Sequence, residues 1–173
     1  MTVGAERHIV LVGMMGVGKS SVGRALASRL ERPLLDSDEM VEQTTGRTVR
    51  EIWDADGEPH FRSLEAAALR SALAWPEPAV IAAAGGAVLS VENRELLAGE
   101  AARVVWLLAG IDVLLERVRN GMHRPLLDAD PEGTLTEMFE QREALYREVA
   151  DAIVSVDHRS PSDVMHAVLR CTN

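Results

Sequence analysis

Short runs of apolar residues alternate along this chain with longer segments in which apolar positions recur every three or four residues. A short apolar run is typical of a buried strand, and the longer period is typical of an amphipathic helix. The apolar runs lie at 8–12, 33–35, 79–83, 103–108 and 152–156. The helical patterns lie at 19–30, 37–44, 48–74 with an interruption near Gly57, 90–98, 111–119, 134–150 and 162–170. This alternation predicts an α/β fold of three layers, with helices on both faces of a parallel sheet.

A glycine-rich segment follows the first apolar run and leads into the first helical pattern. It reads G-x-x-x-x-G-K-S from Gly13 to Ser20. Strand, glycine loop and helix together form the context of a phosphate-binding P-loop, in which backbone N–H groups and a helix N-terminus face the anion. In such a loop Lys19 reaches the β- and γ-phosphates, and the Ser20 hydroxyl is a ligand of Mg²⁺. We therefore expect a nucleoside triphosphate to contact Gly13, Met14, Met15, Gly16, Val17, Gly18, Lys19, Ser20 and Ser21.

Composition narrows the class of protein. The length of 173 residues predicts a single domain over residues 1–173, and the 47% hydrophobic content is ample for its core. A net charge of −9 and a pI near 5.0 argue against a nucleic-acid binder, while a small anionic substrate can still bind through local arginines. Cys171 is the only cysteine, so no internal disulfide can form, as is typical of a reducing compartment.

Two apolar segments could suggest export or membrane insertion. The run 8–18 after Arg7 resembles a signal peptide, but Lys19 and Arg24 then place charge before the small residues 25–27. The run 104–115 is interrupted by Asp112 and is too short to span a bilayer. We therefore expect a cytoplasmic protein with no membrane partner. Separately, we expect it to be a monomer.

The segment 120–133 has poor helical periodicity and contains several helix breakers. It predicts a long loop, and long loops in compact enzymes often act as lids. Arg124 lies in it. A loop arginine is usually solvated, but an arginine that a closing lid delivers can offset charge on a transferring phosphoryl group.

Asp36, Ser37 and Asp38 follow the second apolar run directly. A carboxylate at that strand end could support Mg²⁺ or accept a hydrogen bond from a reacting hydroxyl. The alternative is that Asp36 is only a helix N-cap, with Glu39 at the third helical position. The residue pattern alone leaves both open.

Arginines and glycines further along the chain are equally ambiguous. Glu58 is four residues before Arg62 and Glu65 three after it, which usually means solvated ion pairs on a helix. The alternative is that Arg62 binds a substrate carboxylate through its planar fork.

Gly85 and Gly86 follow the third apolar run and either form an ordinary turn or let a ligand approach the backbone. Arg142 could be an ordinary surface charge.

Several motifs follow one another in the order that one known family has. They are Gly13–Ser20, Asp36-Ser37-Asp38, Gly57-Glu58 with Phe61-Arg62 and Glu65, Gly85-Gly86-Ala87-Val88, Arg124-Pro125-Leu126-Leu127, and Arg142 with Leu145-Tyr146. From about Ile9 to Pro161 the chain resembles the shikimate kinase family. The resemblance implies a P-loop kinase fold similar to nucleoside monophosphate kinases, with a five-stranded parallel sheet. It also implies transfer of the ATP γ-phosphate to the 3-hydroxyl of shikimate, with Mg²⁺, on the route to aromatic amino acids.

The resemblance also implies roles for individual residues. Lys19, Asp38 and Arg124 would be catalytic, with Asp38 orienting or deprotonating the attacking hydroxyl. Ser20 and Asp36 would hold Mg²⁺. The remaining roles are binding of shikimate by Asp38, Arg62, Gly85, Gly86 and Arg142, and of ATP by the P-loop, Arg124 and Arg159, with Arg117 or Arg119 stacking on adenine. The acceptor-binding region would span about 36–65, and the mobile lid about 120–133.

One position departs from the family pattern, which has three consecutive glycines where this chain has Ala84-Gly85-Gly86. Alanine at position 84 costs little if its φ is negative and adds roughly 1 kcal/mol of strain if φ is positive. Two other functions fit parts of the pattern: a kinase for a related polyhydroxy acid such as gluconate, and a catalytically silent nucleotide-binding module.

Overall fold

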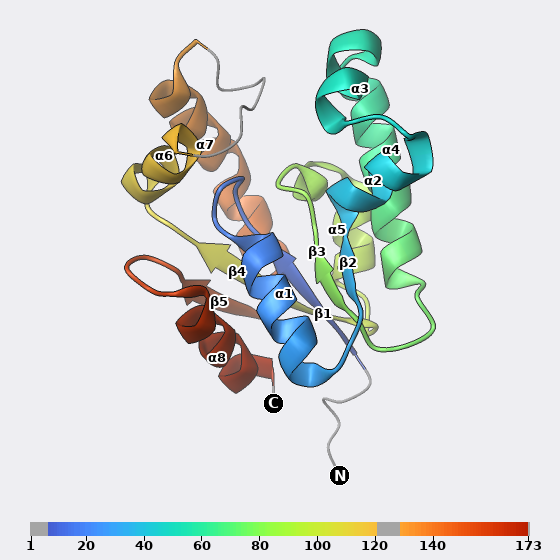
Figure 1. Ribbon diagram of the computed structural model, residues 1–173, viewed down its shortest axis with the longest axis vertical. Helices are drawn as coiled ribbons and strands as arrows, with labels where there is room; N and C mark the ends of the chain where they lie inside the picture. The colour runs from blue at the N-terminus through green and yellow to red at the C-terminus, as the bar shows by residue number, and fades with distance from the viewer. Residues whose placement is uncertain (1–6, 121–128, 173) are drawn as a thin grey trace.

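A five-stranded parallel sheet in the order β2-β3-β1-β4-β5 forms the centre of the molecule (Figure 1). The computed structural model describes residues 7–120 and 129–172. The strands are β1 His8–Val12, β2 Leu34–Asp36, β3 Val80–Ala82, β4 Ala102–Leu108 and β5 Ala152–Ser155. The helices are α1 Lys19–Leu30, α2 Ser37–Thr45, α3 Val49–Asp56, α4 Glu58–Leu73, the 3₁₀ helix η1 Ala87–Leu89, α5 Val91–Leu97, α6 Ile111–Arg119, α7 Pro131–Val149 and α8 Pro161–Thr172.

Helices cover both faces of the sheet and bury its central strands. α1 and α8 pack together on one face, while α5 and α7 contact β4 from the other (Figure 1). Every residue of β1 is buried, as expected for the middle strand of a parallel sheet. Gly23 lets α1 approach closely, because a Cβ there would lie 2.9 Å from the Leu34 side chain. The predicted three-layer α/β/α fold with five parallel strands is confirmed.

The helix boundaries follow local signals in the sequence. The predicted interruption near Gly57 is confirmed: α3 ends and α4 begins there, and Gly57 has a φ of 82° that favours glycine. The loop predicted over 120–133 is wrong at its end, because α7 begins at Pro131. The Asp130 side chain caps that helix by accepting a hydrogen bond from Gly133 N at 3.0 Å, and proline suits the first helical position.

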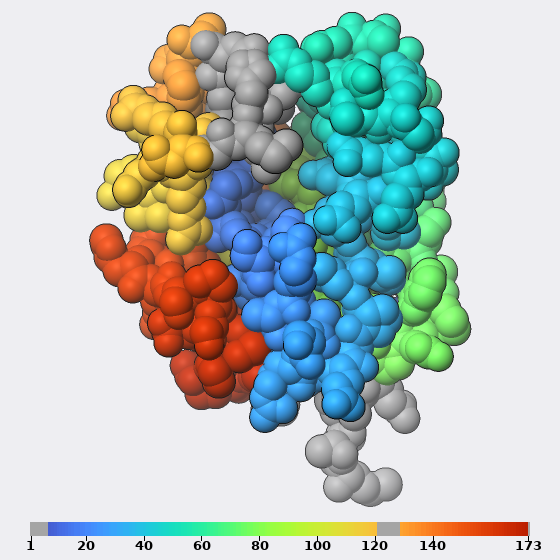
Figure 2. All heavy atoms as spheres, viewed as in Figure 1, coloured from blue at the N-terminus to red at the C-terminus, as the bar shows by residue number. Residues whose placement is uncertain are grey.

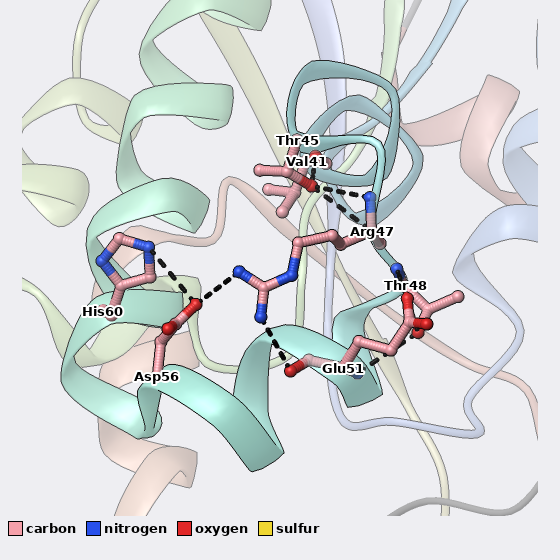
Figure 3. Close-up of polar contacts among 7 residues, drawn as sticks. All are labelled: Val41, Thr45, Arg47, Thr48, Glu51, Asp56 and His60. Carbon is pink, nitrogen blue, oxygen red and sulfur yellow. Dashed lines mark hydrogen bonds and ion pairs between the residues drawn. The ribbon is translucent and has the colours of Figure 1, made fainter.

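Helices α2, α3 and α4 pack on one another and form a helical arm, residues 37–73, beside the carboxyl end of β2 (Figure 1). Arg47 joins its parts, as Figure 3 shows: its guanidinium donates to Asp56 Oδ2 at 2.6 Å and to the Glu51 carbonyl at 3.0 Å. Thr48 and Glu51 form a capping box that starts α3. These bonds tie the segment between α2 and α3 to both ends of α3, which is followed at Gly57 by α4, the helix that carries Arg62.

Within residues 7–120 and 129–172, the structure contains no helix that is both long enough and apolar enough to cross a membrane.

Candidate active site

A cleft of about 500 Å³ opens at the carboxyl ends of the strands, where ligands bind in open α/β sheets. Figure 2 shows this hollow between α6 and the helical arm, with the glycine loop after β1 at its floor. Its lining includes residues 15–22 of the glycine loop and α1, together with Asp36, Asp38, Gly85, Arg117 and Arg159. Segments that are far apart in the sequence therefore meet in one cleft.

The glycine loop has the backbone that a P-loop needs. Gly16 and Gly18 have φ values of 80° and 100°, which favour glycine, and Gly18 is the N-cap of α1. Lys19 Nζ donates to the carbonyls of Gly13 at 2.8 Å and Met14 at 3.0 Å, so the ammonium group lies over the loop. The Met14 side chain is buried in the core, so this residue presents its backbone to the loop.

Asp36 uses its two carboxylate oxygens in two directions. Oδ1 accepts hydrogen bonds from the backbone N–H groups of Asp38 at 3.1 Å and Glu39 at 3.4 Å, and so caps α2. Oδ2 accepts a hydrogen bond of 2.5 Å from the Ser20 hydroxyl at the start of α1. The capping interpretation and the metal-support interpretation of Asp36 are therefore compatible, because each needs only one oxygen.

The donor set around Ser20 fits Mg²⁺. A hydroxyl and a carboxylate beside a phosphate-binding loop supply the few oxygen ligands that Mg²⁺ takes from protein, the rest coming from phosphates and water. Across the described ranges, no three or more His, Cys, Asp or Glu side chains gather as a possible metal site. Such a cluster would be expected for structural zinc rather than for Mg²⁺ held with a nucleotide.

Arg62 pairs with both of its helical neighbours. Its NH1 donates to Glu65 Oε1 and Oε2 at 2.9 and 3.0 Å, and its NH2 donates to Glu58 Oε1 at 3.2 Å. The two pairs differ in kind, because the Glu65 side chain is 2% exposed and that of Glu58 is 52% exposed. Arg62 is thus anchored by a buried carboxylate and is not an ordinary solvated surface charge.

Glu65 lies among charged groups of the site. Burial raises the pKa of its carboxyl, and Arg62 acts in the opposite direction. The negative charge of Asp38 adds to the increase and the positive charge of Arg142 opposes it. Asp38 and the two arginines therefore lie close enough to Glu65 to influence its ionisation, which brings the predicted acceptor residues together.

Gly86 leaves room for Arg62, and Gly85 lets the turn lie close to the P-loop. A Cβ on Gly86 would collide with the guanidinium of Arg62. One on Gly85 would lie 3.3 Å from Met15 N in the P-loop and in ordinary contact, at 3.6 Å, with NH1 of Arg142. Neither glycine has a positive φ, so space and not backbone conformation requires glycine here. Ala84 has no positive φ either, so its methyl group adds no backbone strain.

Arg142 approaches the same turn from α7. It is 4% exposed, and its Nε has no hydrogen-bond partner within the described part of the chain. Arg142 lies close enough to Glu65 and Tyr146 to influence their ionisation, but its buried Nε, which costs stability when unpaired, still lacks a partner among the described residues. A bound carboxylate between Arg62 and Arg142 would give one.

Two further arginines lie at the other end of the cleft. Arg117 donates from NH1 to the Val17 carbonyl at 2.9 Å, whereas Arg119 is exposed and does not line the cleft. Of the two arginines predicted as alternatives, the structure therefore places Arg117 at the site. Arg159 lines the cleft beside Pro161. Arg124 belongs to residues 121–128, which lie outside the described residues.

Sequence reasoning missed three residues of the site: Ser37, Glu65 and Tyr146. Ser37 and Tyr146 bond to the turn that contains the two glycines. The signal for Glu65 was its spacing of three residues from Arg62, but spacing does not distinguish a buried partner from a solvated one. Ser37 and Tyr146 carried no signal beyond their places inside two motifs.

Comparisons with known proteins agree with this geometry. The family model described as shikimate kinase matches residues 15–173. A shikimate kinase of Streptomyces coelicolor is 45% identical over 161 residues, which are 93% of this chain and 92% of that protein. A shikimate kinase of Pseudomonas syringae pv. tomato is 42% identical over 164 residues, 94% of each chain.

Among solved structures, a shikimate kinase is similar to this chain in both fold and sequence, and a gluconokinase is similar in fold. Shikimate kinase from Acinetobacter baumannii in complex with shikimate has a TM-score of 0.90 at 36% identity, over 95% of this chain and 91% of that one. A gluconokinase from Sinorhizobium meliloti has a TM-score of 0.62 at 23% identity, over 97% and 92% of the two chains. At that identity the likeness to the gluconokinase shows a shared fold alone.

Proposed function

The chain belongs to the shikimate kinase family, and we propose that the cleft between its P-loop and the turn Ala84–Ala87 is the active site in which it transfers the ATP γ-phosphate to the 3-hydroxyl of shikimate. Family membership favours this activity over a gluconate kinase and over a silent nucleotide-binding module. The roles of individual residues below are our proposals.

The P-loop side of the cleft would bind the phosphates. Lys19 would leave the carbonyls of Gly13 and Met14 for the β- and γ-phosphates, since its ammonium already lies over the loop. The backbone N–H groups at the start of α1 would face the same charge. Ser20 and Asp36 would hold Mg²⁺, which when bound neutralises charge on the phosphates.

The opposite side of the cleft would bind shikimate. Arg62 and Arg142 would grip its carboxylate, because both guanidinium groups lie against the turn that contains Gly85 and Gly86. Asp38 lines the cleft, and its charge acts on Glu65, the buried partner of Arg62. From there its carboxylate would accept a hydrogen bond from the 3-hydroxyl, orienting it toward the γ-phosphate and accepting its proton.

The far end of the cleft would hold the adenine base. Arg117 and Arg159 line it together with Val156, Pro161 and Val164, so a planar base would meet both guanidinium and apolar surface.

The role of Arg124 as an arginine delivered by a lid over about 120–133 stays a prediction. So do a single domain over 1–173, an acceptor region at about 36–65, and a cytoplasmic monomer.

One observation carries the proposal. The carboxyl ends of β1, β2 and β3 bring Ser20, Asp36 and Asp38 into one cleft with Gly85, which both predicted carboxylate-binding arginines approach. The test is release of ADP from Mg-ATP with shikimate, quinate or gluconate as acceptor. We expect release that depends on shikimate. A folded enzyme that turns over another acid and ignores shikimate would overturn the assignment.

A further inference from the structure

Side chains from three helices hold the turn Ala84–Ala87. Ser37 Oγ at the start of α2 accepts a hydrogen bond from Ala84 N at 2.8 Å. The Tyr146 hydroxyl on α7 donates to the Gly85 carbonyl at 2.6 Å, and Asn93 Nδ2 on α5 donates to the Ala87 carbonyl at 3.0 Å. All three side chains belong to buried residues. A four-residue turn therefore has an anchor on each of three neighbouring helices.

These bonds set the directions of the two glycine N–H groups. In a trans peptide the carbonyl of one residue and the N–H of the next point in opposite directions, and the described chain has no cis peptide bond. The Ala84 carbonyl accepts from Ala87 N at 3.0 Å, which turns the Gly85 N–H the other way. The Gly85 carbonyl accepts from Tyr146, which turns the Gly86 N–H away from α7.

The Tyr146 ring packs in the core, whereas its hydroxyl bonds to the turn. The ring is fully buried and stacks on Trp106 of β4, with centroids 5.6 Å apart and planes 25° apart. Burial raises the pKa of the phenol to about 12, so the hydroxyl stays a neutral donor at physiological pH. Arg142 lies one helical turn before Tyr146 on α7, so one helix presents both a guanidinium and a hydroxyl to the turn.

We propose that Tyr146 is a positioning residue for the acceptor: its hydroxyl, through the Gly85 carbonyl, aims the Gly86 N–H at bound shikimate and keeps the turn in register with Arg142. This inference rests on the proposed function. Tyr146 touches neither reacting group. Gly85 also packs against the P-loop backbone at Gly13 and Met15, so the KM for ATP is measured beside that for shikimate, and we expect the larger effect on the acceptor. The effect is on acceptor affinity, because the aimed N–H contacts shikimate before and during transfer alike.

The test is Tyr146→Phe, which keeps the ring and its stacking on Trp106 and removes only the hydroxyl. We expect the KM for shikimate to rise roughly fivefold to tenfold, because a change of this size corresponds to the loss of about one hydrogen bond. The KM for ATP and the kcat at saturating shikimate should change less than about twofold. Thr172→Val is the matched control, because it removes another hydroxyl bond, from Thr172 to the Val168 carbonyl on α8, away from the turn.

The outcomes separate the possible failures. A variant with a lower melting temperature and both KM values unchanged would mean that the hydroxyl is only structural, which overturns the inference. Equal rises in both KM values would mean general damage to the fold and would overturn it too. Isothermal titration of ADP checks that the nucleotide site of the variant is intact. If the parent enzyme shows no release of ADP that depends on shikimate, the proposed function fails first.

Discussion

The Ser20 hydroxyl donates a 2.5 Å hydrogen bond to Oδ2 of Asp36, and Oδ1 of the same carboxylate caps α2. One side chain thereby links the start of α1, which follows the P-loop, to the start of α2, which carries Asp38. A change at Asp36 should affect both the phosphate side and the geometry of the acceptor side.

Asp36→Asn should lower turnover, and excess Mg²⁺ should restore part of the loss. Asparagine keeps an oxygen for the N-cap but lacks the charge that favours a divalent cation. The measurement is turnover over a series of Mg²⁺ concentrations. Asp130→Asn is the matched control, because Asp130 caps α7 in the same way. A loss that does not respond to Mg²⁺ would mean that Asp36 acts only as a cap.

Replacing Arg62 or Arg142 by alanine should weaken shikimate binding by roughly 2–4 kcal/mol, because each would lose charged hydrogen bonds to one carboxylate. ATP binding should change far less. Calorimetric titration of each ligand into each variant measures this. Arg47→Ala is the control within the helical arm, since its guanidinium binds Asp56 and the Glu51 carbonyl. Equal weakening of both ligands would contradict the assignment of the two arginines.

Gly86→Ala should weaken shikimate binding in a folded protein, whereas Ala84→Gly should lower stability without changing shikimate binding. The new Cβ at position 86 collides with the Arg62 guanidinium, which can swing aside, so we expect a folded protein with roughly tenfold weaker shikimate binding. Ala84 needs no positive φ, so glycine there should lower the free energy of unfolding by roughly 0.4–1 kcal/mol and leave the KM for shikimate unchanged. Melting curves and steady-state kinetics separate the two effects.

The periodic pattern predicted the fold well because each element carries its own signal. The strands match the apolar runs within one or two residues, and Gly57 divides the long helical pattern as predicted. The start of α7 was missed although Asp130 and Pro131 are ordinary N-cap and first-turn residues. The helix breakers around these two residues favour a loop and mask the start of the helix.

The site was less predictable because its chemistry depends on burial and on contacts between distant segments. The spacing of Arg62 and Glu65 is the same for a solvated pair and for the buried pair in the structure. The bond from Tyr146 to Gly85 joins residues 61 positions apart, and no local pattern encodes it. Asp36 illustrates a different limit, because the sequence offered two interpretations as alternatives and the geometry satisfies both.

The stability of the protein should fall as the pH drops below the ordinary histidine value near 6.5, because of His8. This side chain is 6% exposed and its Nδ1 accepts a hydrogen bond from Ala79 N at 3.1 Å. Burial lowers its pKa, and the positive charge of Arg32 acts in the same direction. The neutral form of His8 is thus favoured in the folded state. Its contribution to the free energy of unfolding is full above pH 6.5 and is lost as the pH falls toward the lower pKa of the folded state.

The measurement for His8 is the melting temperature between pH 7.5 and 5.0. His8→Asn keeps an acceptor near Nδ1 but does not titrate, so its melting temperature should fall less over this range. A parent and a variant whose melting curves shift in parallel with pH would assign the acid sensitivity to other groups.

Asp38→Asn should separate chemistry from binding. Asparagine keeps the size of the side chain and one acceptor oxygen but cannot take a proton, and orienting or deprotonating a hydroxyl is worth on the order of 10²–10⁴ in rate. We expect nearly normal ATP binding, a loss of most turnover, and no recovery with added Mg²⁺, in contrast to Asp36→Asn. The backbone N–H of Asp38 still bonds to Asp36, so α2 keeps its cap and the melting temperature should change little. If Asp38→Asn turns over like the parent enzyme, the carboxylate that acts on the 3-hydroxyl is another one, and the buried Glu65 beside Arg62 becomes the next to test.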